Sequence, residues 1–272
     1  METWHVVLLA LIQALTEFLP VSSSGHLALV GFFLGWPYQG ITFDLALHLG
    51  TLVAVVVYFW RDLMLIARET LKLRRWSLAT PEQRMGVGLV VATIPAALAG
   101  LLMPDAFAEA LRRPALIAVN LIAFGILLGI ADRWRRGTRS EPSLGLGEVL
   151  LIGAAQALAL IPGTSRSGIT LTAGLALGLE RNAAARYSFL MSVPITALAA
   201  AHGVMSALRG HEAIGIPTLL LGAAISGVAG IAVIHLLLAV LRRAGTLPFV
   251  LYRIALGIVV LLLVARGAAA PG

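Results

Sequence analysis

Four polar side chains near the N-terminus have types and spacings that could carry chemistry. Gln13 and Glu17 are four residues apart, so on a helix they share one face. Glu17 follows an apolar stretch, and an acidic residue at membrane depth usually faces a polar interior and has a function. Ser23 could attack phosphorus if a base removes its proton, and His26 could be a general base or acid near neutral pH. The carboxylate and the amide could also hold a divalent cation through oxygen atoms.

A second polar segment has the composition of a phosphate site. It runs Pro162-Gly-Thr-Ser-Arg-Ser-Gly-Ile-Thr170, with Arg166 among hydroxyl groups and glycines. The guanidinium fork matches two phosphate oxygens. The pattern predicts a helix that starts at about Gly168, whose free backbone N–H groups would add donors.

Several of these residues also have a purely structural interpretation. Ser22, Ser23 and Ser24 could cap the helix that follows them, and the Thr170 hydroxyl could bond to the carbonyl one turn earlier. His26 could be a structural hydrogen-bonding residue, while Glu17 and Arg166 could extend to water from helix ends. Asp44 and His48, four residues apart at the start of a span, could line the entrance of the site, but we interpret them as interfacial.

The composition indicates an integral membrane protein. Of 272 residues, 59% are hydrophobic and only 12% are charged, whereas soluble domains carry roughly a quarter charged residues. The absence of cysteine excludes disulfides and thiolate chemistry. The net charge of +7 comes from loops between apolar segments, which favours an anionic membrane surface over nucleic acid as the partner. The first five residues lack a basic region, so we expect no cleaved signal peptide.

The apolar pattern predicts an all-α protein with about six transmembrane helices. The predicted spans cover approximately residues 42–60, 86–103, 114–131, 183–207, 217–241 and 247–266. Two further apolar stretches are broken by Pro, Gly and Ser, so each predicts a re-entrant helical hairpin, over 5–35 and 146–179. Fourteen Lys and Arg residues fall in loops on one side and four on the other, which places the richer side in the cytoplasm and both termini outside.

The two hairpins match when the sequence is shifted by 143 residues, which places Gln13-Ala-Leu over Gln156-Ala-Leu. Ser22, Ser24 and Gly25 then lie over Ser165, Ser167 and Gly168. The interpretation is one membrane domain of two repeats, 1–131 and 132–272, each with one hairpin and three spans. Three spans per copy invert the second copy, and inverted repeats with broken helices often build a site near the midplane.

The two polar motifs resemble the undecaprenyl-diphosphatase (bacitracin-resistance) family. The first runs from Gln13 and Glu17 through Phe18-Leu-Pro-Val-Ser-Ser to Gly25-His26, and the second is Pro162 to Thr170. The length and the order of spans also fit. The resemblance implies hydrolysis of undecaprenyl diphosphate to the monophosphate, which recycles the carrier for cell-wall synthesis and confers bacitracin resistance. It further implies a divalent cation, Mg²⁺ or Ca²⁺, and a bacterial cytoplasmic (inner) membrane with the site open to the outer, periplasmic face.

The resemblance also implies roles for individual residues. Glu17 and Gln13 would belong to the metal and acid/base group, and Ser23 and His26 would form the nucleophile and base pair, with the assignment between them open. A larger set would bind the phosphates of the lipid: Ser22, Ser24, Ser165, Arg166, Ser167 and Thr170. Two positions depart from the usual family pattern, since Gln13 replaces Glu and Ser24 replaces Thr. The first departure removes one negative charge from the predicted metal site.

The sequence hypothesis is therefore in-line attack on the terminal phosphorus by Ser23 or water, with charge neutralised by Arg166 and a cation. The rival is a transporter or flippase for a prenyl phosphate, because inverted repeats with broken helices are transporter architecture. An intramembrane serine protease fits less well, since Arg166 would then have no task. The expected partners are a prenyl diphosphate lipid and membrane lipids, no nucleic acid, and a possible second copy of the chain in a homodimer.

Overall fold

The computed structural model describes residues 2–36, 38–72, 79–104, 110–134, 137–209 and 215–267. In these segments the regular structure is helical, apart from one isolated bridge between Arg139 and Leu179. The all-α prediction is confirmed.

Five helices are long and apolar enough to cross a membrane. These are α5 (Pro81–Leu102), α7 (Pro114–Trp134), α10 (Arg181–Arg209), α11 (Ile216–Ala244) and α12 (Leu247–Ala265). A sixth candidate span is the pair α3 (Ile41–Tyr58) and α4 (Trp60–Leu71), which bend by 80° at Phe59. The expected number of spans, about six, therefore agrees with the structure.

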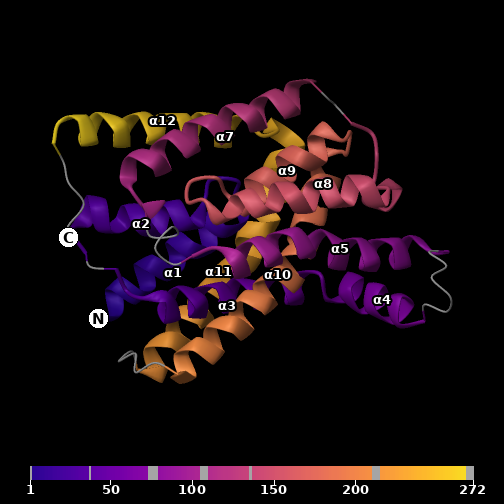
Figure 1. Ribbon diagram of the computed structural model, residues 1–272, viewed down its shortest axis with the longest axis horizontal. Helices are drawn as coiled ribbons and strands as arrows, with labels where there is room; N and C mark the ends of the chain where they lie inside the picture. Colours follow the sequence, from indigo (N-terminus) through magenta and orange to yellow (C-terminus); the bar gives the residue numbers. More distant parts are fainter. Residues whose placement is uncertain are drawn as a thin grey trace.

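Helix α4 corrects one boundary of the sequence interpretation, which placed a connecting loop between the predicted spans 42–60 and 86–103. Its charged residues, such as Asp62 and Glu69, mimic a loop in composition, but they share the inward face of the helix with the buried Ile66. The 80° bend at the start of this helix turns it away from the axis of α3. Figure 1 shows α4 lying beside α5 at the end of the molecule opposite the termini.

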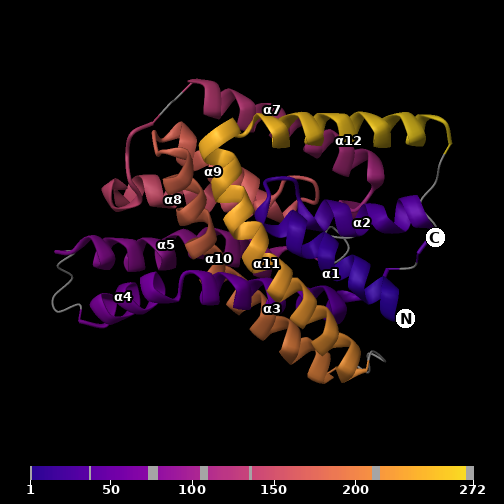
Figure 2. The same cartoon turned by 180° about the vertical axis from the view of Figure 1, so that it is seen from behind.

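The remaining helices are too short to span a bilayer, which takes roughly 20 residues. The first hairpin consists of α1 (Thr3–Phe18) and α2 (Ser23–Leu34). The second consists of α8 (Leu146–Ala157), the 3-10 turn η2 (Leu158–Leu160) and α9 (Arg166–Ala176), preceded by a second 3-10 turn, η1 (Glu141–Ser143). Figures 1 and 2 show the hairpins entering from opposite ends, so that their tips, residues 19–22 and 161–165, meet in the middle.

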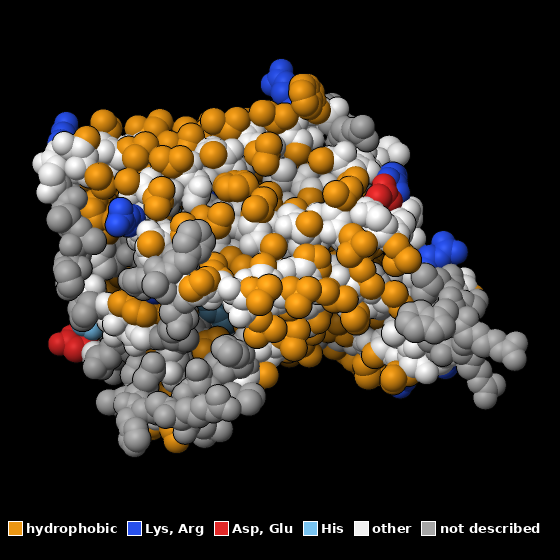
Figure 3. Space-filling view, in the orientation of Figure 1, with side chains coloured by type: hydrophobic (Ala, Val, Ile, Leu, Met, Phe, Trp, Pro, Cys, Tyr) orange, Lys and Arg blue, Asp and Glu red, His pale blue; other side chains and the backbone are white. Residues whose placement is uncertain are grey.

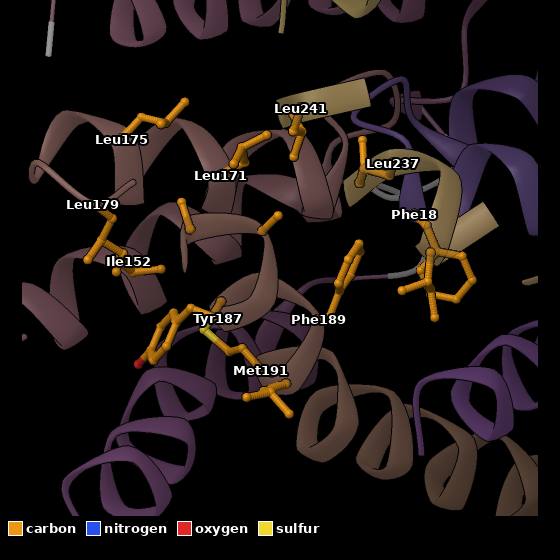
Figure 4. Close-up of a cluster of buried hydrophobic side chains, with 14 of the residues drawn as sticks. Phe18, Ile152, Leu171, Leu175, Leu179, Tyr187, Phe189, Met191, Leu237 and Leu241 are labelled. Carbon is orange, nitrogen blue, oxygen red and sulfur yellow. The ribbon is translucent and has the colours of Figure 1, made fainter. Parts of the chain in front are cut away.

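The long helices pack around these hairpins. Helix α11 crosses α3 and α1, α12 runs along α7, and α5 packs on α8. Figure 1 shows helices such as α3, α5 and α12 running along the long axis of the molecule while α10 and α11 cross it obliquely, with the start of α1 and the end of α12 on the same side. Small residues permit the closest crossing, because a Cβ on Gly50 of α3 would lie 2.1 Å from the carbonyl oxygen of Ala223 in α11. A buried apolar cluster lies beside the hairpins, and in it the Phe18 and Phe189 rings meet edge to face at 5.6 Å (Figure 4).

The surface has the distribution of a membrane protein. Hydrophobic side chains cover the middle of the face in Figure 3, and charged side chains lie toward its ends. At the end opposite the termini, Arg186 bonds to Asp62 at 2.7 Å and to Glu141 at 2.9 Å. Arg139 pairs with Glu148 at 2.7 Å in the same region. These ion pairs connect α10, α4, η1 and α8, and thereby fix the base of the second hairpin.

Candidate active site

Each tip turns at a serine whose backbone has a left-handed conformation. Ser22 has φ +79° and Ser165 has φ +74°, and they are the non-glycine residues with positive φ in the described part of the chain. Each hydroxyl accepts a hydrogen bond from the N–H group three residues later, Gly25 at 3.3 Å and Gly168 at 3.1 Å. Both serines are therefore N-caps of the outgoing helix. This backbone is costly for a residue with a side chain, and it persists because the surroundings hold it.

The two tips are joined directly. The Gly163 N–H donates to the Ser22 hydroxyl at 3.1 Å, and the Ser167 hydroxyl donates to the carbonyl of Leu19 at 3.1 Å. The predicted phosphate ligands Ser22, Ser165 and Ser167 are buried, and their hydroxyls hold backbone groups here. Phosphate contact by these three hydroxyls stays a prediction.

Arg253 of α12 is a residue that the sequence analysis missed. It is fully buried and donates to backbone carbonyls of both tips, Pro20 at 2.9 Å, Gly163 at 2.8 Å and Thr164 at 3.0 Å. It also donates to two carbonyls of α7, those of Asn120 and Leu121. A lone arginine inside an apolar span was the available signal, because a buried charge needs this many partners.

Glu17 is the centre of the site. Ser23 donates to its Oε2 atom at 2.6 Å, and Arg166 donates to its Oε1 atom at 2.7 Å. The Gln13 amide N–H donates to Oε2 at 3.2 Å. The carboxylate is 9% exposed. Gln13, Glu17, Ser23 and Arg166 were each predicted as site residues, and the structure brings them together from both hairpins.

Arg166 is the first residue of α9 and faces the first hairpin. Its Nη2 atom bonds Glu17, while Nη1 donates to the carbonyl of Ser188 in α10 at 3.0 Å. Thr170 donates to the carbonyl of Arg166 at 2.8 Å, and its hydroxyl lies 2.7 Å from that of Ser188. The Thr170 hydroxyl thus has the backbone partner that the structural interpretation expects, and Ser188 is an additional support that the sequence did not indicate.

His26 lies one turn after Ser23, on the same face of α2. Its Nδ1 atom is 2.7 Å from the Ser22 carbonyl, so Nδ1 carries the proton, because a carbonyl only accepts. Its Nε2 atom then accepts from the Tyr252 hydroxyl at 2.7 Å, and the two rings stack. Among the described residues no hydrogen bond joins His26 to Ser23; the serine is paired with Glu17 instead. Ser24 is exposed, 3.4 Å from the Ser22 hydroxyl.

His48 of α3 also reaches the site. Its Nε2 atom lies 3.5 Å from Oε2 of Glu17, and its imidazole is 30% exposed. Asp44, one turn earlier, accepts from the Tyr38 hydroxyl at 2.9 Å. The interfacial interpretation of His48 was therefore incomplete, because sequence spacing within α3 does not show which helix its side chain meets.

The oxygen atoms at this site suit a divalent cation that would be bound by the protein and by a phosphate group of the substrate together. Gln13 Oε1 is buried and has no hydrogen-bond partner, and the Glu17 carboxylate and Ser23 hydroxyl add oxygen atoms nearby. Hard cations such as Mg²⁺ are held by one or two carboxylates together with substrate phosphates. The described residues contain no cluster of three His, Asp or Glu side chains that would hold the ion alone.

The fold and this site define a polytopic membrane protein with an Arg, Glu and Ser cluster where two broken helices meet. Residues 6–259 match the model of the family described as bacitracin resistance protein BacA, and the chain belongs to that family. It is 48% identical to the undecaprenyl-diphosphatase of Chromohalobacter salexigens over 97% of this chain and 100% of that protein. It is 46% identical to the undecaprenyl-diphosphatase of Nitrosococcus oceani over 94% of this chain and 97% of the relative. Undecaprenyl-diphosphatase 2 of Stutzerimonas stutzeri is 46% identical, with 97% and 98% covered.

Proposed function

We propose that this protein hydrolyses undecaprenyl diphosphate to undecaprenyl phosphate and inorganic phosphate. The reaction recycles the lipid carrier of cell-wall synthesis, and relatives that match over nearly the whole chain are named for it. The observation that carries the proposal is the contact of Glu17 with both Ser23 and Arg166. Within one site, the hydroxyl can act as nucleophile, the carboxylate as base and the guanidinium as the group that binds the phosphate.

In the first step the Ser23 oxygen attacks the terminal phosphorus, and the bond to the bridging oxygen breaks. Glu17 Oε2, 2.6 Å from the hydroxyl, accepts the serine proton. Undecaprenyl phosphate leaves with the bridging oxygen, and the terminal phosphoryl group stays on Ser23. Arg166 neutralises charge on the phosphoryl oxygens through its fork, held in place by the Ser188 carbonyl.

In the second step water attacks the phosphoserine and the bond to Ser23 breaks, which releases inorganic phosphate. His26 is suited to remove a proton from this water, because its Nε2 lone pair can accept from water in place of Tyr252. The Ser22 carbonyl holds Nδ1 and therefore fixes the tautomer. A bound divalent cation would neutralise charge on the diphosphate, with Glu17 and Gln13 as its protein ligands.

We also propose that the chain forms an inverted repeat with two re-entrant hairpins and lies in a bacterial inner membrane. Its support is the matched geometry of Ser22 and Ser165 and the opposite directions of the hairpins in Figure 1. The arginine-rich side is assigned to the cytoplasm by the excess of positive charge, and the site opens to the periplasmic face. The prenyl tail remains in lipid while the headgroup enters the site. Every group named comes from one chain, so a homodimer would add nothing to the chemistry.

The test is phosphate release from undecaprenyl diphosphate by detergent-purified protein, with Mg²⁺ or Ca²⁺ and after chelation. Cation-dependent release is expected from the wild type and is expected to be lost in Glu17→Ala and Arg166→Ala. Arg181→Ala is the matched control, because Arg181 pairs with Asp132 at 2.6 Å outside the site. No release from folded wild-type protein, or near-normal turnover by Arg166→Ala, would overturn the proposal, and the first result would direct attention to lipid movement in sealed vesicles.

A further inference from the structure

The contact between His48 and Glu17 has no hydrogen-bond donor between the two facing atoms when the imidazole is neutral. His48 Nδ1 lies 2.7 Å from the carbonyl oxygen of Asp44, and this oxygen can only accept, so Nδ1 carries the proton. In the neutral ring Nε2 then carries a lone pair and no proton. It faces Oε2 of Glu17 at 3.5 Å, longer than a normal N–H···O hydrogen bond.

The Gln13 amide lies beside the same carboxylate and carries an oxygen atom without a partner. Gln13 is fully buried, and its Oε1 atom has no hydrogen-bond partner. Its Nε2 atom is 3.2 Å from Glu17 Oε2, and a half-turn of the amide exchanges the two atoms. Oε1 would then face the carboxylate as well. Three electron-rich atoms from α1 and α3 around one position are stable together when a cation lies among them.

We propose that His48 is a direct ligand of the divalent cation, together with Glu17 and Gln13. This inference deepens the proposed function. It rests on that function only for the substrate phosphate, which would complete the coordination of the cation. A histidine that binds a metal usually donates its other ring N–H to a backbone carbonyl or carboxylate, which fixes the ring. The Asp44 carbonyl has this position relative to His48. The 30% exposure of the imidazole leaves an open side to the site.

The nitrogen ligand has a consequence for the choice of metal. Carboxylate and amide oxygens alone suit Mg²⁺ and Ca²⁺, whereas imidazole favours transition metals. The set of His48, Glu17 and Gln13 should therefore bind Mn²⁺ more tightly than Ca²⁺. His48→Gln replaces the nitrogen with oxygen and should remove most of this preference.

The test uses Mn²⁺ alone, with the tag-free full-length protein in detergent and no substrate. Pulsed electron paramagnetic resonance of bound Mn²⁺ should show coupling to an imidazole ¹⁴N nucleus in the wild type. The coupling should vanish in His48→Gln, with Mn²⁺ affinity lowered about tenfold or more. It should persist in His235→Gln, the matched control on α11, whose imidazole lies 3.3 Å from the Tyr58 hydroxyl.

Absence of Mn²⁺ binding, or bound Mn²⁺ without ¹⁴N coupling in the wild type, would overturn the inference whatever the variants do. Coupling that survives in folded His48→Gln would overturn it too, since another histidine would then be the ligand. Phosphate release is measured separately on the same protein. An active enzyme without His48 coordination contradicts the ligand assignment alone, and a protein that binds Mn²⁺ through His48 without releasing phosphate contradicts the proposed function alone.

Discussion

Both hairpin tips turn at a serine with positive φ, Ser22 in the first and Ser165 in the second, and both cap the next helix through a glycine N–H. The residues around these serines differ. Ser23 of the first tip corresponds in sequence to Arg166 of the second, and Glu17 corresponds to Leu160. The shared positions shape the backbone, whereas the differing positions supply the carboxylate, hydroxyl and guanidinium of the site. Two similar scaffolds thus contribute different chemistry to one point.

The largest expected effect concerns a position where the tips differ. Ser23→Ala removes the nucleophile, so phosphate release should fall by about 10⁴-fold or more. Ser226→Ala is the matched control, because the Ser226 hydroxyl bonds to the Leu47 carbonyl at 2.9 Å, away from the tips. A steady-state assay in detergent measures both. Equal rates for the two variants would remove Ser23 from the mechanism.

The next effect concerns the contact that holds the tips together. Arg253→Met leaves carbonyls of Pro20, Gly163 and Thr164 without their donor, and should lower the free energy of unfolding by about 3–5 kcal/mol. Thermal unfolding in detergent measures the loss, with the exposed Arg266→Met as control. An unchanged midpoint would show that the tips do not depend on this arginine.

A smaller effect distinguishes charge from geometry in the second tip. Arg166→Lys keeps the positive charge but loses the planar fork that reaches both Glu17 and the Ser188 carbonyl. We expect kcat/KM to fall by about 10²-fold. Full activity of the lysine variant would mean that a point charge suffices. Arg181→Lys should change the rate little.

The smallest effect tests the shared backbone. Ser165→Ala removes the cap on Gly168 and should cost about 1 kcal/mol of stability. Ser165→Gly also loses the cap but relieves the positive φ, so its stability should stay close to that of the wild type. Chemical denaturation of both variants measures the difference. Greater loss in the glycine variant would show that the φ angle is not the source of strain.

The local part of this arrangement could be predicted from the sequence. The spacing of Gln13 and Glu17 and the hydroxyl-rich segment around Arg166 indicated the site, because each motif lies within one hairpin. Arg253 was missed and His48 was interpreted as interfacial, because their partners lie on other helices and helix spacing alone does not determine which helices meet. Helix α4 was missed because its charged residues resemble a loop in composition, while the single buried apolar residue among them, Ile66, is a weak signal.

The most direct test of the account is to trap the reaction intermediate by rapid acid quench, with substrate labelled in its terminal phosphate. We expect label to accumulate transiently on Ser23 in the first hairpin and not on the serines of the second, and we expect Ser23→Ala to stay unlabelled and inactive. Hydrolysis at the wild-type rate by Ser23→Ala, or label on Ser165 or Ser167, would contradict the division of roles in which the first hairpin supplies the nucleophile and the second binds the phosphate.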